Sequence, residues 1–307
     1  MMITIVLNSF FRSGSTIMMK VMELSNPDAI VLCEPFHEGV YSTLEQVTPR
    51  TPDALHGYPI WGGYFKIPKE ILEKLARAHR KFRDELPLIT NFTKVTDYLD
   101  ILHSIKKEVM FKTTRSHFIL SQMKRRYGCR ILHLIRNPAN TWMDFLHASI
   151  KYNDSLFWRV TTSNRLWNQI KGSFYLGGMY EKVRKMYDLP KARDNLSRFI
   201  MTWIMCNYAG IKASDFTIVY EAVLRRRRLY FNSINRVLGR VVFHPNYAHL
   251  PDERLALEMP MRRGMLNILI TRRIMEYGLV DFYKEIFKVI RGTFAHLRVY
   301  NEYYPRI

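Results

Sequence analysis

Residues 3–24 read ITIVLNSFFRSGSTIMMKVMEL, and this stretch decides the fold class. Its first five residues are all β-branched or aliphatic, which is typical of a buried strand. A turn from Ser9 to Gly14 follows, and helical periodicity then continues to Leu24. A strand that leads through such a turn into a helix predicts the first unit of an α/β sheet, with backbone amides aimed at an anion.

Four further apolar runs have polar or turn residues at both ends, as buried parallel strands do. We expect these strands at residues 29–33, 109–113, 130–135 and 216–220. Helical periodicity fills the intervals, for example in residues 69–83, 116–126 and 196–212. Alternating strands and helices predict an α/β protein with a parallel sheet and helices on both faces.

Two stretches fit this plan poorly. Residues 36–68 are rich in Gly, Pro and aromatic side chains, and we expect a long loop there. Residues 152–190 have a mainly helical pattern with a break at Gly177-Gly178. Because no repeat or clear linker divides the 307 residues, we expect a single domain over residues 1–307.

The composition indicates a globular, basic protein. Hydrophobic residues make up 48% of the chain, enough for one sizeable core. Lys and Arg number 47 against 27 Asp and Glu, which gives a net charge of +20 at pH 7. Such a charge attracts anions. It is compatible with nucleic acid, acidic membranes, polyanionic glycans and phosphate-rich cofactors, and it does not choose among them.

The chain shows no sign of export or membrane insertion. No apolar run reaches about 18 residues, and the N-terminus enters a strand directly, without a signal-peptide pattern. The three cysteines are far apart, which indicates buried free thiols and neither a disulfide framework nor a zinc site. We therefore expect a cytoplasmic protein without a transmembrane segment or a metal requirement.

The turn at residues 9–16 is the first candidate site. Hydroxyl side chains, a planar cation and a glycine surround the start of the helix, which favours an anionic ligand. The nucleotide-binding P-loop, G-x-x-x-x-G-K-[ST], fits poorly, since Ser9 replaces its first Gly and Ser15 replaces its Lys. The alternative is an ordinary Ser/Thr helix cap.

Two more candidate sites follow strand ends. Arg136 ends the apolar run of residues 131–135, at the sheet edge where open α/β sheets bind ligands. Glu34 and His37 follow the expected second strand, and either side chain is a suitable general base for a hydroxyl. In isolation each of these residues is equally consistent with a solvated loop position.

In combination the motifs resemble those of sulfotransferases, particularly the Golgi-type carbohydrate and tyrosyl-protein branches. There a turn like residues 12–16 binds the 5′-phosphosulfate end of the donor 3′-phosphoadenosine 5′-phosphosulfate (PAPS). A Glu-Pro pair commonly follows the second strand, and Glu34-Pro35 match it. The 3′-phosphate motif is an apolar run followed by Arg-Asp-Pro, and residues 134–138 are similar, with Asn137 for Asp.

Two further motifs occur in the family's order. Residues 112–115 look like a strand end of the type Lys-Thr-x-Arg, and Tyr220-Glu221 look like the end of a late strand. The resemblance spans roughly residues 1–240. It implies the family's fold, a P-loop-kinase-like three-layer α/β/α sandwich with a central parallel sheet.

The resemblance also implies roles. Glu34 would take the acceptor's proton, with His37 as the alternative base, and Arg12 and Lys112 would stabilise charge at the transferred group. The expected donor-binding residues are Arg12, Ser13, Gly14, Ser15, Thr16, Arg136, Thr141 and Tyr220. The sulfuryl group would pass in line from PAPS to a hydroxyl or amine and leave 3′-phosphoadenosine 5′-phosphate (PAP).

Two departures from the family concern the donor. The family's helix Ser, eight residues after the motif Arg, corresponds to Asp144, whose carboxylate would repel a phosphate. Either Thr141 or Ser149 replaces that Ser, or the 3′-phosphate site is reshaped. The family's C-terminal Arg-Lys-Gly loop has only two loose counterparts, at residues 261–264 and at Arg291-Gly292.

Two functions of other classes fit part of the sequence. A P-loop small-molecule kinase fits the turn but lacks the P-loop Lys. A basic, non-enzymatic module that binds nucleic acid or membrane explains the charge but not the ordered motifs. We therefore expect a small-molecule, glycan, lipid or peptide acceptor as the partner, and no nucleic acid.

Overall fold

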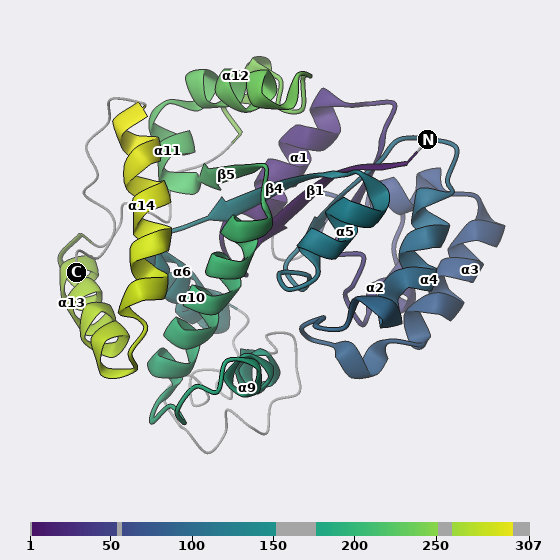
Figure 1. Cartoon of the computed structure of the whole chain (residues 1–307). Helices are drawn as coiled ribbons and strands as arrows, with labels where there is room; N and C mark the ends of the chain where they lie inside the picture. Colours follow the sequence, from purple (N-terminus) through teal and green to yellow (C-terminus); the bar gives the residue numbers. More distant parts are fainter. Residues whose placement is uncertain (1, 54–56, 152–175, 251–259, 297–307) are drawn as a thin grey trace.

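The computed structural model describes residues 2–53, 57–151, 176–250 and 260–296. Within these residues five parallel strands form one sheet in the order β2-β3-β1-β4-β5 (Figure 1). The strands are β1 (Ile3–Ser9), β2 (Ile30–Cys33), β3 (Val109–Thr113), β4 (Arg130–Ile135) and β5 (Phe216–Val219).

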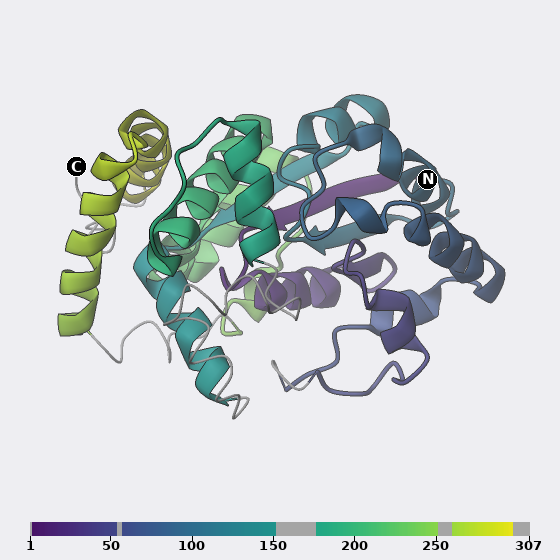
Figure 2. The ribbon, with the colours of Figure 1, turned by 90° about the horizontal axis from the view of Figure 1, so that it is seen from below.

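Helices cover both faces of this sheet. Figure 2 shows α1 (Ser15–Ser25) on one side of the sheet and α10 (Asn195–Ala213) on the other. The cause is visible in β1, where the successive residues Ile5, Val6 and Leu7 are all buried, so that both faces of the strand need a covering layer. The remaining described α-helices are α2 (Val40–Leu44), α3 (Lys69–Arg80), α4 (Phe92–His103), α5 (Leu120–Tyr127), α6 (Pro138–Lys151), α9 (Leu176–Met186), α11 (Tyr220–Arg225), α12 (Arg227–Leu238), α13 (Pro260–Glu276) and α14 (Val280–His296).

The predicted fold class is confirmed. The chain forms a three-layer α/β/α sandwich around a parallel sheet, and β1 lies at its centre, as the P-loop-kinase-like arrangement requires. Every predicted strand is present, and only its ends move: β1 continues to Ser9, β2 begins at Ile30 and β5 ends at Val219. All three cysteines are free and buried, as predicted.

The segment 36–68 contains more regular structure than the sequence predicts. In addition to α2, this segment forms the 3₁₀ helix η1 (Gly62–Lys66), which lies against the edge strand β2. The Tyr64 hydroxyl donates to the Cys33 carbonyl oxygen at 3.0 Å, which holds η1 there. η1 forms because it covers an edge strand, and this contact is with a distant part of the chain. The local sequence pattern of the segment therefore does not predict η1.

Gly63→Ala is expected to lower the free energy of unfolding by about 3 kcal/mol, near the upper end for overpacking. A Cβ at Gly63 would lie 1.9 Å from the Val31 carbonyl oxygen, which belongs to rigid strand backbone. The control is Gly62→Ala, where a Cβ would meet no atom closer than 3.5 Å and the change is expected to stay below about 1 kcal/mol. Urea unfolding measures both variants. Equal effects would contradict the close approach of η1 to β2.

Two other expectations concern helices. The predicted break at Gly177-Gly178 coincides with the start of α9, and the earlier part of that prediction, residues 152–175, lies outside the described residues. Throughout the described part of the chain, no helix combines the length and apolar character needed to cross a bilayer.

Candidate functional site

The candidate residues lie at the carboxyl ends of the strands. From β1 the chain crosses to β2 at one edge of the sheet, and from β4 it crosses to β5 at the other edge. β1 and β4 are neighbours, and the chain leaves them toward opposite edges of the sheet. The two connections therefore diverge at the boundary between these strands. Ligands of open α/β sheets bind at such a switch point, outside the carboxyl ends of the strands.

The turn between β1 and α1 has an uncommon backbone. Arg12 has a φ of 59° and Gly14 a φ of 83°, both in the left-handed region. The first turn of α1 contains no acidic residue, so its amides present an uncompensated positive end. Ser13 Oγ is buried and has no hydrogen-bond partner among the described residues. A buried, unpartnered hydroxyl beside a helix N-terminus fits an anionic group.

Tyr220 brings the ends of β1, β4 and β5 together. A Cβ on Gly14 would lie 2.5 Å from the Tyr220 ring, so the two residues are in close contact. The Arg136 guanidinium carbon lies 5.5 Å from the centroid of the same ring. Arg136 Nη1 also donates to the Arg12 carbonyl oxygen at 2.9 Å. The structure thus brings together the turn, Arg136 and Tyr220, which are remote in sequence.

Glu34 holds two cations at the ends of β2 and β3. Its Oε1 lies 2.7 Å from Lys112 Nζ, and its Oε2 accepts from Arg115 Nη1 at 3.0 Å. The Thr114 amide also donates to Oε2, at 3.1 Å. Burial raises the pKa of this carboxyl, but Lys112 and Arg115 outweigh burial and lower the pKa to about 2. Glu34 is therefore ionised near pH 7, and it is a weak proton acceptor in this state.

His37 lies on the same loop. Its Nδ1 accepts a hydrogen bond from the Gly39 amide at 3.0 Å, which assigns the proton of the neutral ring to Nε2. Burial and the charge of Arg115 lower the pKa of the His37 imidazole, so the ring is neutral at pH 7.

Two of the residues expected around a 3′-phosphate are buried and hydrogen-bonded to other residues of the protein. Arg136 is buried and donates to Asp144 Oδ2. Thr141 is also buried, and its hydroxyl donates to the Asn137 carbonyl oxygen at 2.9 Å, inside its own helix. The side chains of Ser149 and of residues 262–264 lie outside the described residues.

Two charged side chains of the site did not stand out in the sequence. Arg115 is only 1% exposed, and its guanidinium lies 5.1 Å from the Phe11 ring centroid, which joins the β3 end to the first turn. Glu221 Oε1 accepts from the Asn137 amide at 3.0 Å and from Asn140 Nδ2 at 3.1 Å. It thereby caps α6 from a distant element. Each residue belonged to a recognised motif, but its partner is far along the chain.

A buried polar network lies beside the turn. Asn8 Nδ2 donates to the Nδ1 atoms of His117 and His133, each at 2.9 Å. His133 Nε2 donates to Asn207 Oδ1 at 3.0 Å. Burial lowers the pKa of His117 to about 3 and that of His133 to about 4, so both rings are neutral. The network ties β1 to β4 and α10, which stiffens the base of the turn.

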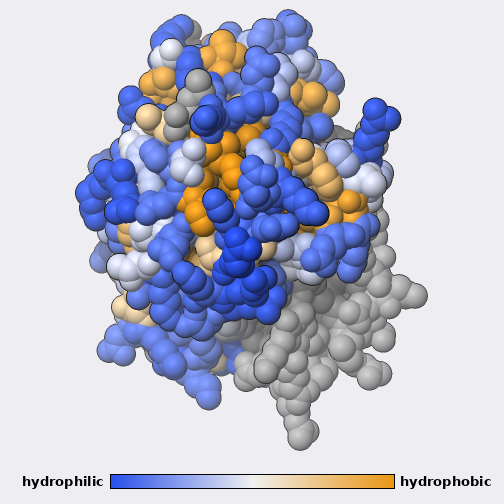
Figure 3. Space-filling model, turned by 90° about the vertical axis from the view of Figure 1, so that its right-hand side faces the viewer, coloured by the Kyte–Doolittle hydropathy of each residue, from blue (hydrophilic) through white to orange (hydrophobic). Residues whose placement is uncertain are grey.

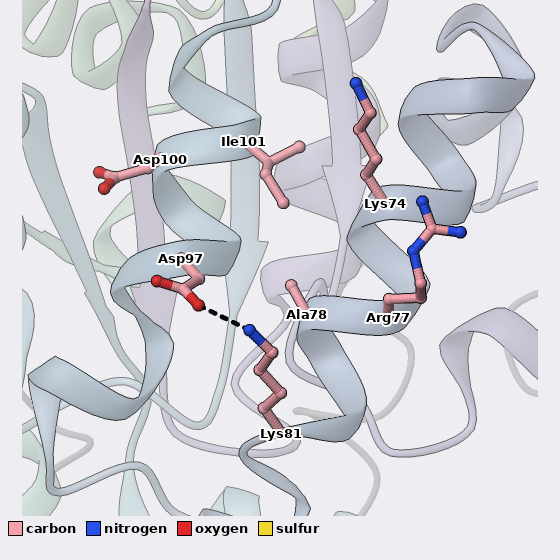
Figure 4. A pocket seen from close by; sticks show the side chains of 7 residues that line it. All are labelled: Lys74, Arg77, Ala78, Lys81, Asp97, Asp100 and Ile101. Atoms are coloured by element: carbon pink, nitrogen blue, oxygen red, sulfur yellow. Dashed lines mark hydrogen bonds and ion pairs between the residues drawn. The ribbon is translucent and has the colours of Figure 1, made fainter.

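An open pocket of about 490 Å³ lies elsewhere, between α3 and α4 (Figure 4). Lys81, which directly follows α3, lies with its Nζ 2.9 Å from Oδ2 of Asp97 on α4. The side of the molecule that carries these helices is mainly hydrophilic, with several hydrophobic patches among the hydrophilic side chains (Figure 3). None of the candidate residues lines this pocket.

Comparisons with known proteins give a distant picture. No family model matches the sequence. An uncharacterised protein of Archaeoglobus fulgidus is 26% identical over 313 residues, which cover 93% of this chain and 98% of that protein. A sulfotransferase from Alicyclobacillus acidocaldarius aligns with a TM-score of 0.41 and 13% identity over 91% of this chain and 95% of its own. A mouse sulfotransferase in complex with PAP aligns with a TM-score of 0.36 and 14% identity over 82% of this chain and 64% of its own.

Proposed function

We propose that this protein is a sulfotransferase, which moves a sulfuryl group from a nucleotide donor of the PAPS type to a hydroxyl or amine acceptor. The observation that carries the proposal is the Arg12–Gly14 turn, with the buried and unpartnered Ser13 hydroxyl at the start of α1. This turn lies at the switch point of the sheet and contacts Tyr220. The ordered sequence motifs agree with this assignment.

The 5′ end of such a donor fits these residues. In this proposal Arg12, Ser13 and the amides that lead into Ser15 and Thr16 hold the 5′-phosphate. When bound, the donor supplies an activated sulfuryl group. Lys112, at the end of β3, stabilises the charge that develops on the group during transfer. The 3′ end of PAPS fits less well, because Asp144 already occupies Arg136.

The acceptor's proton goes to Glu34 or His37 in this proposal. Glu34 Oε1 carries one short contact, to Lys112, and keeps a lone pair for a hydroxyl. His37 is neutral, but its Nδ1 is bonded to the Gly39 amide, so it must exchange this partner before it accepts a proton. The acceptor belongs to the small-molecule, glycan, lipid or peptide classes, and the whole chain acts as one cytoplasmic domain.

Adenosine 5′-monophosphate is expected to raise the melting temperature, whereas adenosine is expected to leave it unchanged. The reason is that ligand binding to the native state stabilises it, by about 2.7 kcal/mol at a concentration of 100 times Kd. Ser13→Ala is expected to reduce the shift. The matched control is Ser25→Ala at the opposite end of α1, where Oγ already donates to the Val21 carbonyl oxygen.

Donor consumption completes this test. We expect PAPS or adenosine 5′-phosphosulfate to be consumed in the presence of a panel of hydroxyl and amine acceptors. If ATP stabilises the protein more than adenosine 5′-monophosphate does, and no sulfated product forms with any acceptor, the protein is a kinase and the proposal is wrong.

A further inference from the structure

The Arg136–Asp144 ion pair sits where the resemblance places the donor's 3′-phosphate. Arg136 follows β4, and Asp144 lies eight residues later on α6. Arg136 Nη1 donates to Asp144 Oδ2, and the two side chains are only 6% and 8% exposed. The same Nη1 donates to the Arg12 carbonyl oxygen at 2.9 Å, so two acceptors hold this nitrogen, while the buried Nε of Arg136 has no hydrogen-bond partner among the described residues.

Two carboxylates, those of Asp144 and Glu221, act on Arg136. Burial lowers the pKa of Arg136, but Asp144, Tyr220 and Glu221 together raise it above its usual value. Glu221 is 2% exposed and stays in place through its bonds to Asn137 and Asn140. A phosphate monoester, with nearly two negative charges at pH 7, would meet a guanidinium that Asp144 has already neutralised.

A carboxylate at this place suits a different group. Carboxylates accept hydrogen bonds from ribose hydroxyls, and dinucleotide-binding proteins use this to separate a free hydroxyl from a phosphorylated one. Of the two hydroxyls considered as replacements, that of Thr141 does not restore the phosphate site, because it donates within its own helix. The side chain of Ser149 lies outside the described residues.

We infer that this site selects a nucleotide with a free ribose 3′-hydroxyl, so that the sulfuryl donor is adenosine 5′-phosphosulfate and not PAPS. This inference rests on the proposed function. In the transfer, the S–O bond to the 5′-phosphate breaks and an S–O bond to the acceptor oxygen forms. The acceptor's proton passes to the base, and adenosine 5′-monophosphate leaves. Asp144 accepts a hydrogen bond from the 3′-hydroxyl. It remains paired with Arg136, which donates to the Arg12 carbonyl oxygen in the turn.

Calorimetric titration with adenosine 5′-monophosphate and with PAP tests the inference on the unmodified protein. The two probes differ only in the 3′-phosphate. We expect the monophosphate to bind at least about tenfold tighter, since a tenfold ratio corresponds to one good charge-assisted contact. Tighter binding of PAP would overturn the inference and leave the proposed function standing. If neither nucleotide binds, the proposed function itself is wrong.

Asp144→Asn provides the second measurement. An Asn side chain keeps the shape and can still accept from Arg136, but it removes the negative charge. We expect PAP to bind about tenfold tighter to this variant than to the unmodified protein, and the monophosphate to change little. The control is Asp281→Asn, which removes the same charge where the side chain is 95% exposed. An unchanged preference in Asp144→Asn would show that Asp144 does not select the nucleotide.

Discussion

Glu34→Gln is expected to lower the turnover of the proposed sulfuryl transfer by about 10²–10⁴-fold, with nucleotide binding retained. Gln keeps the shape and can still accept from the Thr114 amide, but it cannot take a proton. It also leaves Lys112 and Arg115 without their shared counterion, and this costs stability. Steady-state consumption of the donor measures turnover, while calorimetry and thermal unfolding separate binding and folding from the chemistry.

Glu38→Gln is the matched control for this substitution. Glu38 lies on the same loop, but its carboxylate is 3.9 Å from Arg115 and its side chain is 29% exposed. The 3.9 Å separation makes this a much weaker pair than the two close contacts of Glu34, so we expect turnover to change by less than about threefold. Normal turnover in Glu34→Gln together with a large loss in His37→Ala would transfer the role of base to His37.

The pH profile distinguishes the same two bases. The pKa of Glu34 is lowered to about 2, so a reaction that needs its carboxylate keeps its rate from pH 7 down to about pH 4. The pKa of His37 is lowered from 6.5 by burial and by Arg115, so a reaction that needs the neutral imidazole loses rate as the pH falls through this lowered pKa, below 6.5.

Gly14→Ala is expected to abolish nucleotide binding and to destabilise the fold by about 2–5 kcal/mol. Two costs add. A φ of 83° strains any residue with a Cβ by about 1–2 kcal/mol, and the new Cβ would lie 2.5 Å from the Tyr220 ring, which adds about 1–3 kcal/mol of overpacking. Relief of the clash moves Tyr220, and with it the ring on which Arg136 rests.

Gly128→Ala separates the two costs. Gly128 ends α5 with a φ of 65°, and a Cβ there would meet no atom within 4 Å. It therefore carries the backbone strain alone. Urea unfolding of both variants gives the contribution of the Tyr220 contact as their difference. If the two variants lose the same stability, Tyr220 does not press on the turn, and the assignment of Tyr220 to the nucleotide site fails.

The sequence by itself determined the architecture. Apolar runs bounded by turn residues placed all five strands, because burial on both faces of a parallel strand requires an uninterrupted apolar run. The turn at residues 12–16 and the residues after each strand end were also predicted. Carboxyl ends of parallel strands share one edge, so Glu34, Lys112 and Arg136 had to gather there.

Only the tertiary structure determined which of these residues form ion pairs and hydrogen bonds with one another. The sequence presented Glu34 as a free base, whereas Lys112 and Arg115 hold it as a buried counterion. It presented Arg136 as a free cation, whereas Asp144 pairs with it. Charge, pKa and access depend on neighbours within a few ångströms, and those neighbours come from separate strands and helices. Periodicity along the chain indicates which face of a helix or strand a residue lies on. The packing of distant segments determines its pKa and its charged partners.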